Sequence, residues 1–175
     1  AKQIKELIND IVRRYGGVDI LVSNAGTALE ASILYMEEDL LRRSLDINFF
    51  AHFHLAQAIG RVFVAQGNCG QMLFNISKQA VNPGQNFGAY GLPKAALMFL
   101  VKQLALELGE YGIRVNGVNA DRIRSGILNE NIIANRAKAR GFTVKKYMQG
   151  NLLKEEVKAY HVAEAFLNLA LSPRT

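Results

Sequence analysis

Two side chains that could move a proton lie four residues apart, Tyr90 and Lys94 in the run Tyr-Gly-Leu-Pro-Lys. In a helix this spacing puts the phenol and the ammonium on one face. A phenol has a pKa near 10, and a neighbouring ammonium favours its ionised form. The pair therefore indicates general acid/base chemistry. Taken alone, a partly exposed tyrosine beside a lysine that reaches into solvent is the commoner explanation.

A third polar side chain, Ser77, follows an apolar run that ends thirteen residues before Tyr90. Ligands of parallel α/β sheets bind at the carboxyl ends of the strands, so Ser77 and the start of the following helix can meet there. Reducing a carbonyl with hydride leaves an alkoxide that needs a proton, which a positioned phenol can supply. These three residue types suit that reaction, although Ser77 could also simply cap a strand end.

The elements that must position these residues alternate along the chain. Apolar residues at helical spacing, from Ile4 to Val12, predict an amphipathic helix that ends at Gly16-Gly17. A β-branched run at 18–22, typical of a strand covered on both faces, leads into the turn Ser23-Asn24-Ala25-Gly26. A long apolar helix is predicted at 37–66 and a second strand at 72–76.

The second half of the chain repeats this alternation. It predicts a helix over 90–110, with Pro93 tolerated because it lies in the first turn, and a strand over 113–119. Two more helices are expected at 130–140 and 160–171. Strands joined through helices run parallel, so the predicted fold is a doubly wound, Rossmann-like α/β sheet.

Composition limits the class of protein. The chain has 175 residues, 50% of them apolar, which predicts one domain over 1–175. No apolar run reaches the length of a membrane span, and the single Cys69 allows no internal disulfide, so we expect a soluble, cytoplasmic protein without a membrane partner. The net charge of +6 is scattered and lacks interleaved aromatic residues, so we expect no nucleic-acid partner.

The domain is expected to be incomplete. The chain opens on a helix that lacks its preceding strand, and it stops at Ser172 to Thr175 where a further strand would follow. Three strands would make a thin sheet with exposed edges. We therefore expect the first strand-helix units and the last strand to be missing.

With these elements in place, the chain resembles the short-chain dehydrogenase/reductase family over nearly its full length. The matching runs occur in order: Asp19 to Gly26, Asn48, Asn75-Ile76-Ser77, Tyr90 to Leu97, and Gly112 to Asn116. The family's tetrad of Asn, Ser, Tyr and Lys then falls on Asn48, Ser77, Tyr90 and Lys94. Its Asn-Asn-Ala-Gly turn falls on Ser23 to Gly26, with Ser in the first place.

The resemblance implies a role for each residue of the tetrad. Tyr90 would be the acid/base, Ser77 would bind the substrate oxygen, and Asn48 would hold a water that links Lys94 to solvent. Lys94 would lower the pKa of Tyr90 and grip the ribose of NAD or NADP, which carries the hydride. Cofactor contacts would come from Asn24, Ala25, Gly26, Tyr90, Lys94, Ala120, Ile123 and Ser125.

Several of these residues also have structural explanations. Asn48 could satisfy backbone groups in its helix, Asn24 could stabilise a turn, and Gly26 could serve either the turn or close approach to the cofactor. His52, His54 and His161 fit no metal-ligand spacing with carboxylates or Cys69, so we predict no metal site and structural or surface roles for them.

The segment after the third strand departs from the family pattern. Ala120 and Asp121 replace the usual Pro-Gly pair, and Ser125 replaces a Thr. Asp121, Arg122 and Arg124 would place charge near the substrate entrance, or would form a solvated loop. The glycine-rich phosphate turn of the family is not in this sequence, so the choice between NAD and NADP cannot be read from it.

Two stretches, 77–84 and 118–126, resemble a narrower subgroup: the dehydrogenase portion of bacterial bifunctional rhamnulose-phosphate aldolase/short-chain dehydrogenases. That resemblance implies a fused aldolase domain, a place in the breakdown of rhamnose through lactaldehyde, and an aldehyde or small hydroxy compound as the alcohol/carbonyl substrate. The same elements also fit a non-catalytic, dehydrogenase-like module whose long helices serve only oligomerisation.

The two long helices predict self-association. They are more apolar than covering one sheet face requires, and we expect them to pair with their copies in a homodimer or homotetramer. The residues that carry this excess are Phe49, Phe50, Phe53, Leu97, Phe99 and Leu100.

Overall fold

The computed structural model describes residues 2–173, and its three strands form one parallel sheet in the order β1-β2-β3. The strands are β1 (Ile20–Ser23), β2 (Gly70–Asn75) and β3 (Ile113–Val118). In the register, Leu21 lies opposite Met72, and Met72 lies opposite Val115. All three strands end at the same edge of the sheet. The predicted α/β class with parallel strands is confirmed.

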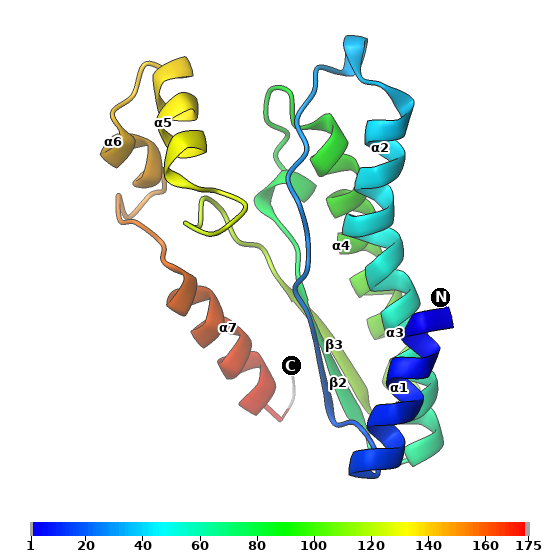
Figure 1. Cartoon of the computed structure of the whole chain (residues 1–175). Coiled ribbons are helices and arrows are strands. Elements are labelled where there is room, and N and C mark those ends of the chain that lie inside the picture. The colour runs from blue at the N-terminus through cyan, green and yellow to red at the C-terminus, as the bar shows by residue number, and fades with distance from the viewer. Residues whose placement is uncertain (1, 174–175) are drawn as a thin grey trace.

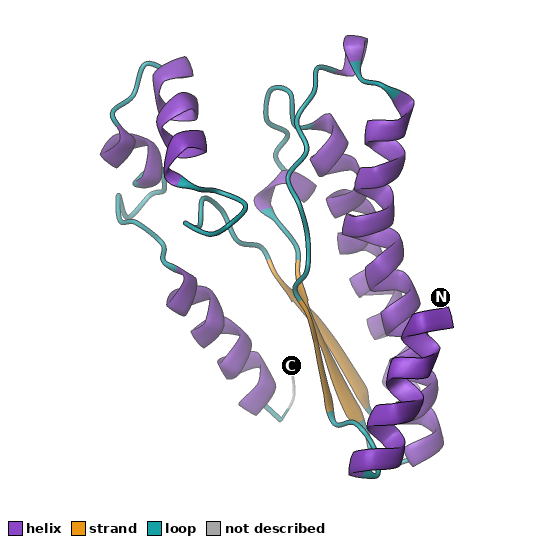
Figure 2. Cartoon of the chain, viewed as in Figure 1, coloured by secondary structure: helices purple, strands orange, loops and turns teal. Residues whose placement is uncertain are grey.

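Helices cover the two faces of the sheet unequally. Helices α1 (Lys2–Tyr15), α3 (Ala51–Gln66) and α4 (Gly88–Leu108) lie on one face, whereas α7 (Ala159–Leu171) lies on the other and packs against β2 and β3 (Figure 1). Beyond the carboxyl ends of the strands, loops lead to α5 (Glu130–Ala139) and to α6 (Val144–Met148), a short helix that the sequence did not predict (Figure 2).

The main core lies between the sheet and α3 and α4. Phe63, Met72 and Phe74 are fully buried there. Leu97 is also fully buried, which corrects its assignment to an oligomer surface: α4 turns this residue toward the sheet. A second small cluster holds α5 and α6 together and consists of Leu128, Ile133, Ala137, Tyr147 and Met148.

The strand predicted to be covered on both faces is covered on only one. Ile20 and Val22 of β1 are 48% and 53% exposed, whereas Leu21 and Ser23 are buried. The reason is positional, because β1 is an edge strand and α7 packs mainly over β2 and β3. Among residues 2–173, no helix is both long and apolar enough to cross a membrane.

The predicted helix over 37–66 is continuous but contains a wider turn. Helix α2 (Glu38–Leu45) runs into a π-helical turn, η2 (Asp46–Phe50), which leads directly into α3. Asn48 is the central residue of this turn. Single π-helical turns of this kind often occur at functional sites.

Helix α4 begins two residues before its predicted start, so Pro93 lies in the second turn and not the first. The Phe87 carbonyl accepts hydrogen bonds from the backbone amides of Tyr90 and Gly91, which closes the first turn early. Pro93 cannot donate to the carbonyl four residues before it, and the helix continues without that bond. Short 3₁₀ turns that the sequence did not predict are η1 (Ile33–Tyr35), η3 (Lys78–Ala80) and η4 (Gly109–Tyr111).

Candidate active site

Ser77, Tyr90 and Lys94 line one cleft at the carboxyl ends of the strands. Ser77 follows β2 and caps η3, where its Oγ accepts from the Gln79 amide at 3.2 Å. Tyr90 and Lys94 come from the first two turns of α4, which packs against η3. The cleft has a volume of about 510 Å³. The structure therefore brings together the three side chains that the sequence analysis selected.

Lys94 is the buried cation of the cleft, with only 3% of its surface exposed. Its Nζ donates a hydrogen bond to the Asn75 carbonyl at 2.9 Å and lies 5.8 Å from the centre of the Tyr90 ring. Burial lowers the pKa of Lys94 to about 8, because the charged form loses hydration. Lys94 therefore still carries a proton at neutral pH.

The pKa of Tyr90 differs from the sequence expectation. Burial raises the pKa of Tyr90 above its usual value of 10, and a side-chain hydrogen bond with Ser77 only partly offsets this. Lys94 does not lower it toward neutrality in this structure, because loss of hydration is the largest effect on the buried phenol. Tyr90 is consequently neutral at pH 7, the state in which it can donate a proton.

Asn48 lies behind Lys94 and is completely buried. Its Oδ1 accepts from the Thr27 amide at 3.0 Å, and its Nδ2 donates to the Thr27 carbonyl at 2.9 Å and to Ser44 Oγ at 3.0 Å. A Cβ on Gly26 would lie 3.0 Å from Asn48 Oδ1 and 3.7 Å from Lys94 Nζ. Gly26 therefore lets the loop after β1 pack against both side chains, an explanation that the sequence did not suggest.

The last residue of β1, Ser23, pairs with a buried histidine. Ser23 Oγ and His52 Nδ1 are 2.6 Å apart. Burial, with a smaller effect from the Lys94 charge, lowers the pKa of His52 to about 4, so the ring is neutral at pH 7. Asn24, which lines the cleft, accepts a hydrogen bond from Asn75 Nδ2 at 2.7 Å. This pair joins the ends of β1 and β2.

The segment after β3 contributes another wall. Ala120, Ile123 and Ser125 line the cleft as predicted for cofactor contacts, whereas Ala25 and Asn48 are not among its lining residues. Ser125 Oγ also accepts a hydrogen bond from the Leu128 amide at 3.2 Å. The predicted cofactor residues are thus mostly brought together on the cleft wall.

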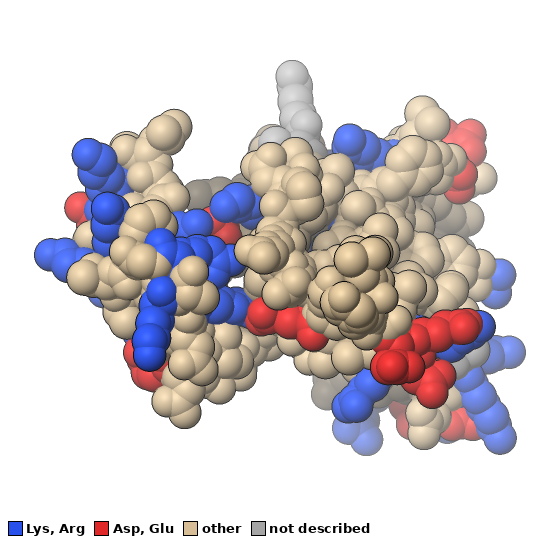
Figure 3. Space-filling model, turned by 90° about the horizontal axis from the view of Figure 1, so that it is seen from above, with Lys and Arg blue, Asp and Glu red and all other residues tan. Residues whose placement is uncertain are grey.

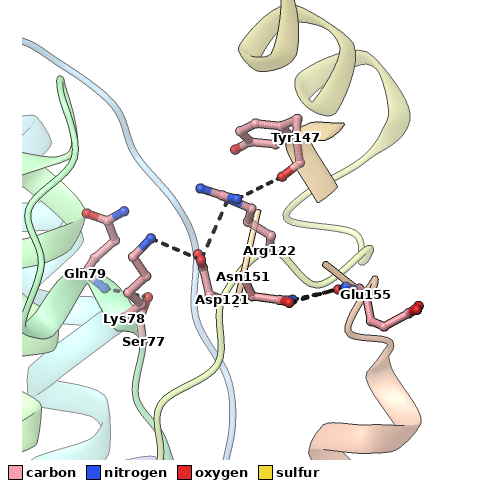
Figure 4. Close-up of polar contacts among 8 residues, drawn as sticks. All are labelled: Ser77, Lys78, Gln79, Asp121, Arg122, Tyr147, Asn151 and Glu155. Carbon is pink, nitrogen blue, oxygen red and sulfur yellow. Dashed lines mark hydrogen bonds and ion pairs between the residues drawn. The ribbon is translucent and has the colours of Figure 1, made fainter. Parts of the chain in front are cut away.

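The charged residues of this segment are ordered by ion pairs. Asp121 lies between Lys78 and Arg122, at 3.1 Å from Lys78 Nζ and 3.7 Å from Arg122 Nε (Figure 4). Arg124 is held by Glu130 and Glu156 and does not line the cleft. Of the three charges expected at the entrance, Asp121 and Arg122 are therefore at the cleft.

The sequence analysis missed the wall formed by α5, α6 and the loop before α4. Four residues of this wall line the cleft: Arg136 of α5, Arg140 directly after α5, Tyr147 of α6, and Phe87. The spacing of Arg136 and Arg140, one helical turn apart, was the only signal in the sequence. Nothing in the local pattern showed that α5 folds back over the end of the sheet. Among residues 2–173, no three His, Cys, Asp or Glu side chains gather in a way that could hold a metal ion.

A parallel Rossmann-like sheet, with a serine, a tyrosine and a lysine in one cleft at the strand ends, defines a dehydrogenase-like class of protein. A family model described as enoyl-(acyl carrier protein) reductase matches residues 1–174. The chain belongs to the short-chain dehydrogenase/reductase family.

Individual relatives match parts of the chain. It is 38% identical over 105 residues to D-erythrulose reductase of Gallus gallus, an alignment that covers 59% of this chain and 42% of the relative. It is 37% identical over 114 residues to an uncharacterized oxidoreductase, YuxG, of Bacillus subtilis, covering 64% of this chain but 16% of the relative.

A solved structure supports the fold. A short-chain type dehydrogenase/reductase from Mycobacterium marinum superposes with a TM-score of 0.87 at 28% identity, covering 99% of this chain and 66% of that one. Among the curated relatives, the alignments span about half of the relative's length or less.

Proposed function

We propose that the protein containing this chain is an oxidoreductase that transfers a hydride between NAD or NADP and an alcohol/carbonyl substrate. The observation that carries the proposal is the meeting of Ser77, Tyr90 and Lys94 in one cleft at the carboxyl ends of the strands. Such positions are where open α/β sheets bind ligands. A donor phenol, a hydroxyl and a buried ammonium are the groups that proton transfer to an alkoxide needs.

We assign each of these side chains a task. Tyr90, neutral at pH 7, gives its proton to the substrate oxygen during reduction and takes it back during oxidation. Ser77 hydrogen-bonds Tyr90 and is placed to hold the same substrate oxygen. Lys94 uses one donor on the Asn75 carbonyl, which leaves two N–H donors and a positive charge beside the phenol.

In this proposal the cleft also receives the nicotinamide end of the cofactor. We propose that Lys94 holds ribose hydroxyls, while Asn24, Gly26, Ala120, Ile123 and Ser125 border the ring, since these residues offer the amide, ammonium and backbone groups that such a ligand pairs with. When bound, the nicotinamide accepts or supplies the hydride and, in its oxidised form, adds a positive charge that favours the Tyr90 phenolate. Asn48 acts as a positioning residue, because it fixes the Thr27 loop beside Lys94.

We further propose that the substrate is a small hydroxy compound or aldehyde and that the dehydrogenase is fused to a second, aldolase domain. The sequence resemblance of 77–84 and 118–126 supports this. The relative in Bacillus subtilis bears only on the presence of a further domain: the alignment covers 64% of this chain but 16% of that protein, so most of that protein lies outside the aligned part. The name of the Gallus gallus relative, D-erythrulose reductase, is that of an enzyme acting on a small polyhydroxy ketone.

The test is to replace Tyr90 in the full-length protein. Tyr90→Phe removes the ionisable oxygen but keeps the ring, so turnover should fall by about a hundredfold to ten-thousandfold while cofactor affinity changes little. Lys94→Ala should reduce both turnover and cofactor affinity. The measurements are steady-state kinetics across pH and fluorescence titration of the reduced cofactor.

The matched control is Tyr111→Phe, because Tyr111 is 48% exposed at the far end of α4. This variant should keep wild-type turnover. A pH-dependent limb of the rate governed by Tyr90 should disappear from the residual activity of Tyr90→Phe. Wild-type turnover by Tyr90→Phe would rule the mechanism out.

A further inference from the structure

One wall of the cleft is cationic. Figure 3 looks down on the strand ends and shows Lys and Arg side chains gathered on the lobe formed by α5 and α6, beside the hollow that separates it from the main body. The charged residues that line the cleft are five cations and one carboxylate: Lys78, Lys94, Arg122, Arg136, Arg140 and Asp121. The cleft therefore carries an excess of positive charge that Asp121 cannot neutralise.

Arg136 is the least exposed of these guanidinium groups, with 13% of its side chain accessible. It forms an ion pair with Glu30 and stacks on Phe87, with 4.5 Å between its Cζ and the ring centre. Its Nε is buried and has no hydrogen-bond partner among the described residues. A buried, charge-bearing donor without a partner is costly, and native proteins usually satisfy such groups with a ligand or water.

Tyr147 forms a platform for two further guanidinium groups. It is buried, and Arg122 and Arg140 lie over its ring at 4.8 Å and 5.5 Å from the centre. Arg122 is fixed by a 2.8 Å hydrogen bond to the Tyr147 carbonyl and by Asp121, as Figure 4 shows. Arg140 is exposed, and within residues 2–173 its Nη1 donates to one backbone carbonyl, that of Arg136 at 3.2 Å. Arg140 therefore keeps most of its donors for a ligand.

Phe87 fixes the distance between this cationic wall and the proposed acid/base. Its ring contacts Tyr90 edge-on, with 6.3 Å between the two ring centres. The Arg136 guanidinium group lies over the same Phe87 ring. The guanidinium group thus lies one aromatic ring away from the phenol. A substrate oxygen at Tyr90 and a negative group at Arg136 can belong to one small molecule.

We propose that the substrate carries an oxyanion group, a carboxylate or a phosphate, a few bonds from its reacting hydroxyl or carbonyl, and that Arg136 and Arg140 bind it. Planar guanidinium groups match the oxygens of both anions through paired hydrogen bonds. The proposal rests on the oxidoreductase function argued above and narrows its substrate class. It also gives the lobe of α5 and α6 a function, because none of the proposed cofactor contacts comes from these two helices.

The first experiment measures equilibrium binding in the full-length Tyr90→Phe protein with cofactor present, so that no turnover is needed. The probes are glycerate and glycerol 3-phosphate, with neutral glycerol as their common reference. We expect saturable binding of at least one anion by calorimetry and at least tenfold weaker binding of glycerol. Adding Arg136→Gln should weaken anion binding at least tenfold, while Arg136→Lys should restore part of it. Saturation by glycerate alone would identify a carboxylate, and saturation by glycerol 3-phosphate alone a phosphate.

Two controls separate a local effect from a general one. Arg140→Gln removes an exposed cation, so it should fold normally and weaken the same anion. Arg14 lies in α1, near the end of the sheet opposite to the cleft (Figure 1). Arg14→Gln should leave anion affinity unchanged. Cofactor affinity, measured in parallel, should be unchanged in both Arg136→Gln and Arg140→Gln.

Three results would overturn the inference. One is equal binding of glycerol and both anions, another is anion binding that Arg136→Gln and Arg140→Gln leave intact, and the third is a loss of cofactor affinity in these variants in place of anion affinity. None of them depends on whether Tyr90 is the acid/base. Conversely, wild-type turnover by Tyr90→Phe would refute the oxidoreductase mechanism while leaving the anion-binding result as measured.

Discussion

At the scale of single residues, His52 shows how the floor of the cleft is kept uncharged. His52 lies one helical turn after Asn48 and is 2% exposed. Its ring forms a hydrogen bond with Ser23. A protonated His52 would place a second positive charge near Lys94, and the Lys94 charge is one of the causes that lower its pKa. The serine in the first place of the Ser23 to Gly26 turn is therefore explained by a partner for a neutral histidine.

This pair predicts a specific dependence of stability on pH. The pKa of His52 falls from 6.5 to about 4 on folding, so between these values the unfolded chain binds more protons than the folded one. Stability should therefore be lost as pH falls from 6.5 to 4, and His52 should account for up to about 3 kcal/mol of that loss. Urea unfolding of the full-length protein at pH 7 and pH 4.5 measures it.

The matched variant is His52→Gln, which retains a hydrogen-bonding group but cannot titrate. It should show a smaller loss of stability between the two pH values than the wild type. His161→Gln, which alters an exposed histidine on α7, should behave like the wild type. If His52→Gln loses as much stability on acidification as the wild type does, another group is responsible.

Residue positions in the site could be predicted where neighbours in sequence are neighbours in space. Tyr90 and Lys94 share a helix, and Ser77 ends the strand that precedes it, so their meeting follows from local pattern and from the rule about strand ends. Arg136 could not be predicted in this way, because its contact with Phe87 depends on how a loop returns α5 over the sheet. The raised pKa of Tyr90 was also not predictable, since it depends on burial in the folded chain.

At the scale of elements, the fit between β2 and α3 depends on one position without a side chain. A Cβ on Gly70 would lie 2.5 Å from two ring carbons of Phe63, which is fully buried. Phe63 cannot move without opening the core beneath the sheet. Gly70 is therefore required by helix-strand packing.

Gly70→Ala should consequently destabilise the protein by about 1–3 kcal/mol through overpacking. The matched control is Gly109→Ala, at a helical position where a Cβ would meet nothing within 4 Å. That change should be neutral or stabilise by up to about 1 kcal/mol, because it restricts the unfolded chain. Denaturant unfolding of both variants and the wild type measures these changes. If Gly70→Ala is as stable as Gly109→Ala, the Phe63 side chain can move to make room for the added Cβ.

The long helices and the strands could be predicted to within about two residues because their apolar periodicity extends over several turns or alternates with turn residues. The helix over 90–110 is observed at Gly88–Leu108, and the strand over 113–119 at Ile113–Val118. Helix α6 has only five residues, too few for a period to be visible. The exposure of β1 required knowing which strands α7 covers.

At the scale of the whole molecule, apolar side chains remain exposed on η2, at the start of α3, and on α4. Phe50, Phe99 and Leu106 are 43%, 66% and 77% exposed. Of the six residues expected to mark an interface, Phe50 and Phe99 fit that description and Leu97 does not, because it is buried. The other three, Phe49, Phe53 and Leu100, are partly buried. Exposed apolar surface of this kind favours self-association through these two helices.

We therefore expect the full-length protein to be a homodimer or homotetramer that Phe99→Glu dissociates, because a carboxylate there would be buried without a partner. Light scattering should report a lower mass for this variant at the same concentration. Leu152→Glu, at a fully exposed position in the loop before α7, should keep the wild-type mass. A monomeric wild type, or an unchanged mass in Phe99→Glu, would place the interface elsewhere or exclude it.

The π-helical turn at Asp46–Phe50 sets the rotation of α2 about the helix axis relative to α3. The turn holds one more residue than an α-helical turn, so deleting a single residue would rotate α2 by about 100° relative to α3. Helix α3 is anchored by Ile59 and Phe63 in the core, so α2 would be the part that turns. Ser44 would then leave its contact with Asn48. The spacing between Ser44 and Asn48 is thus a length constraint, which the deletion of one residue from the turn would violate.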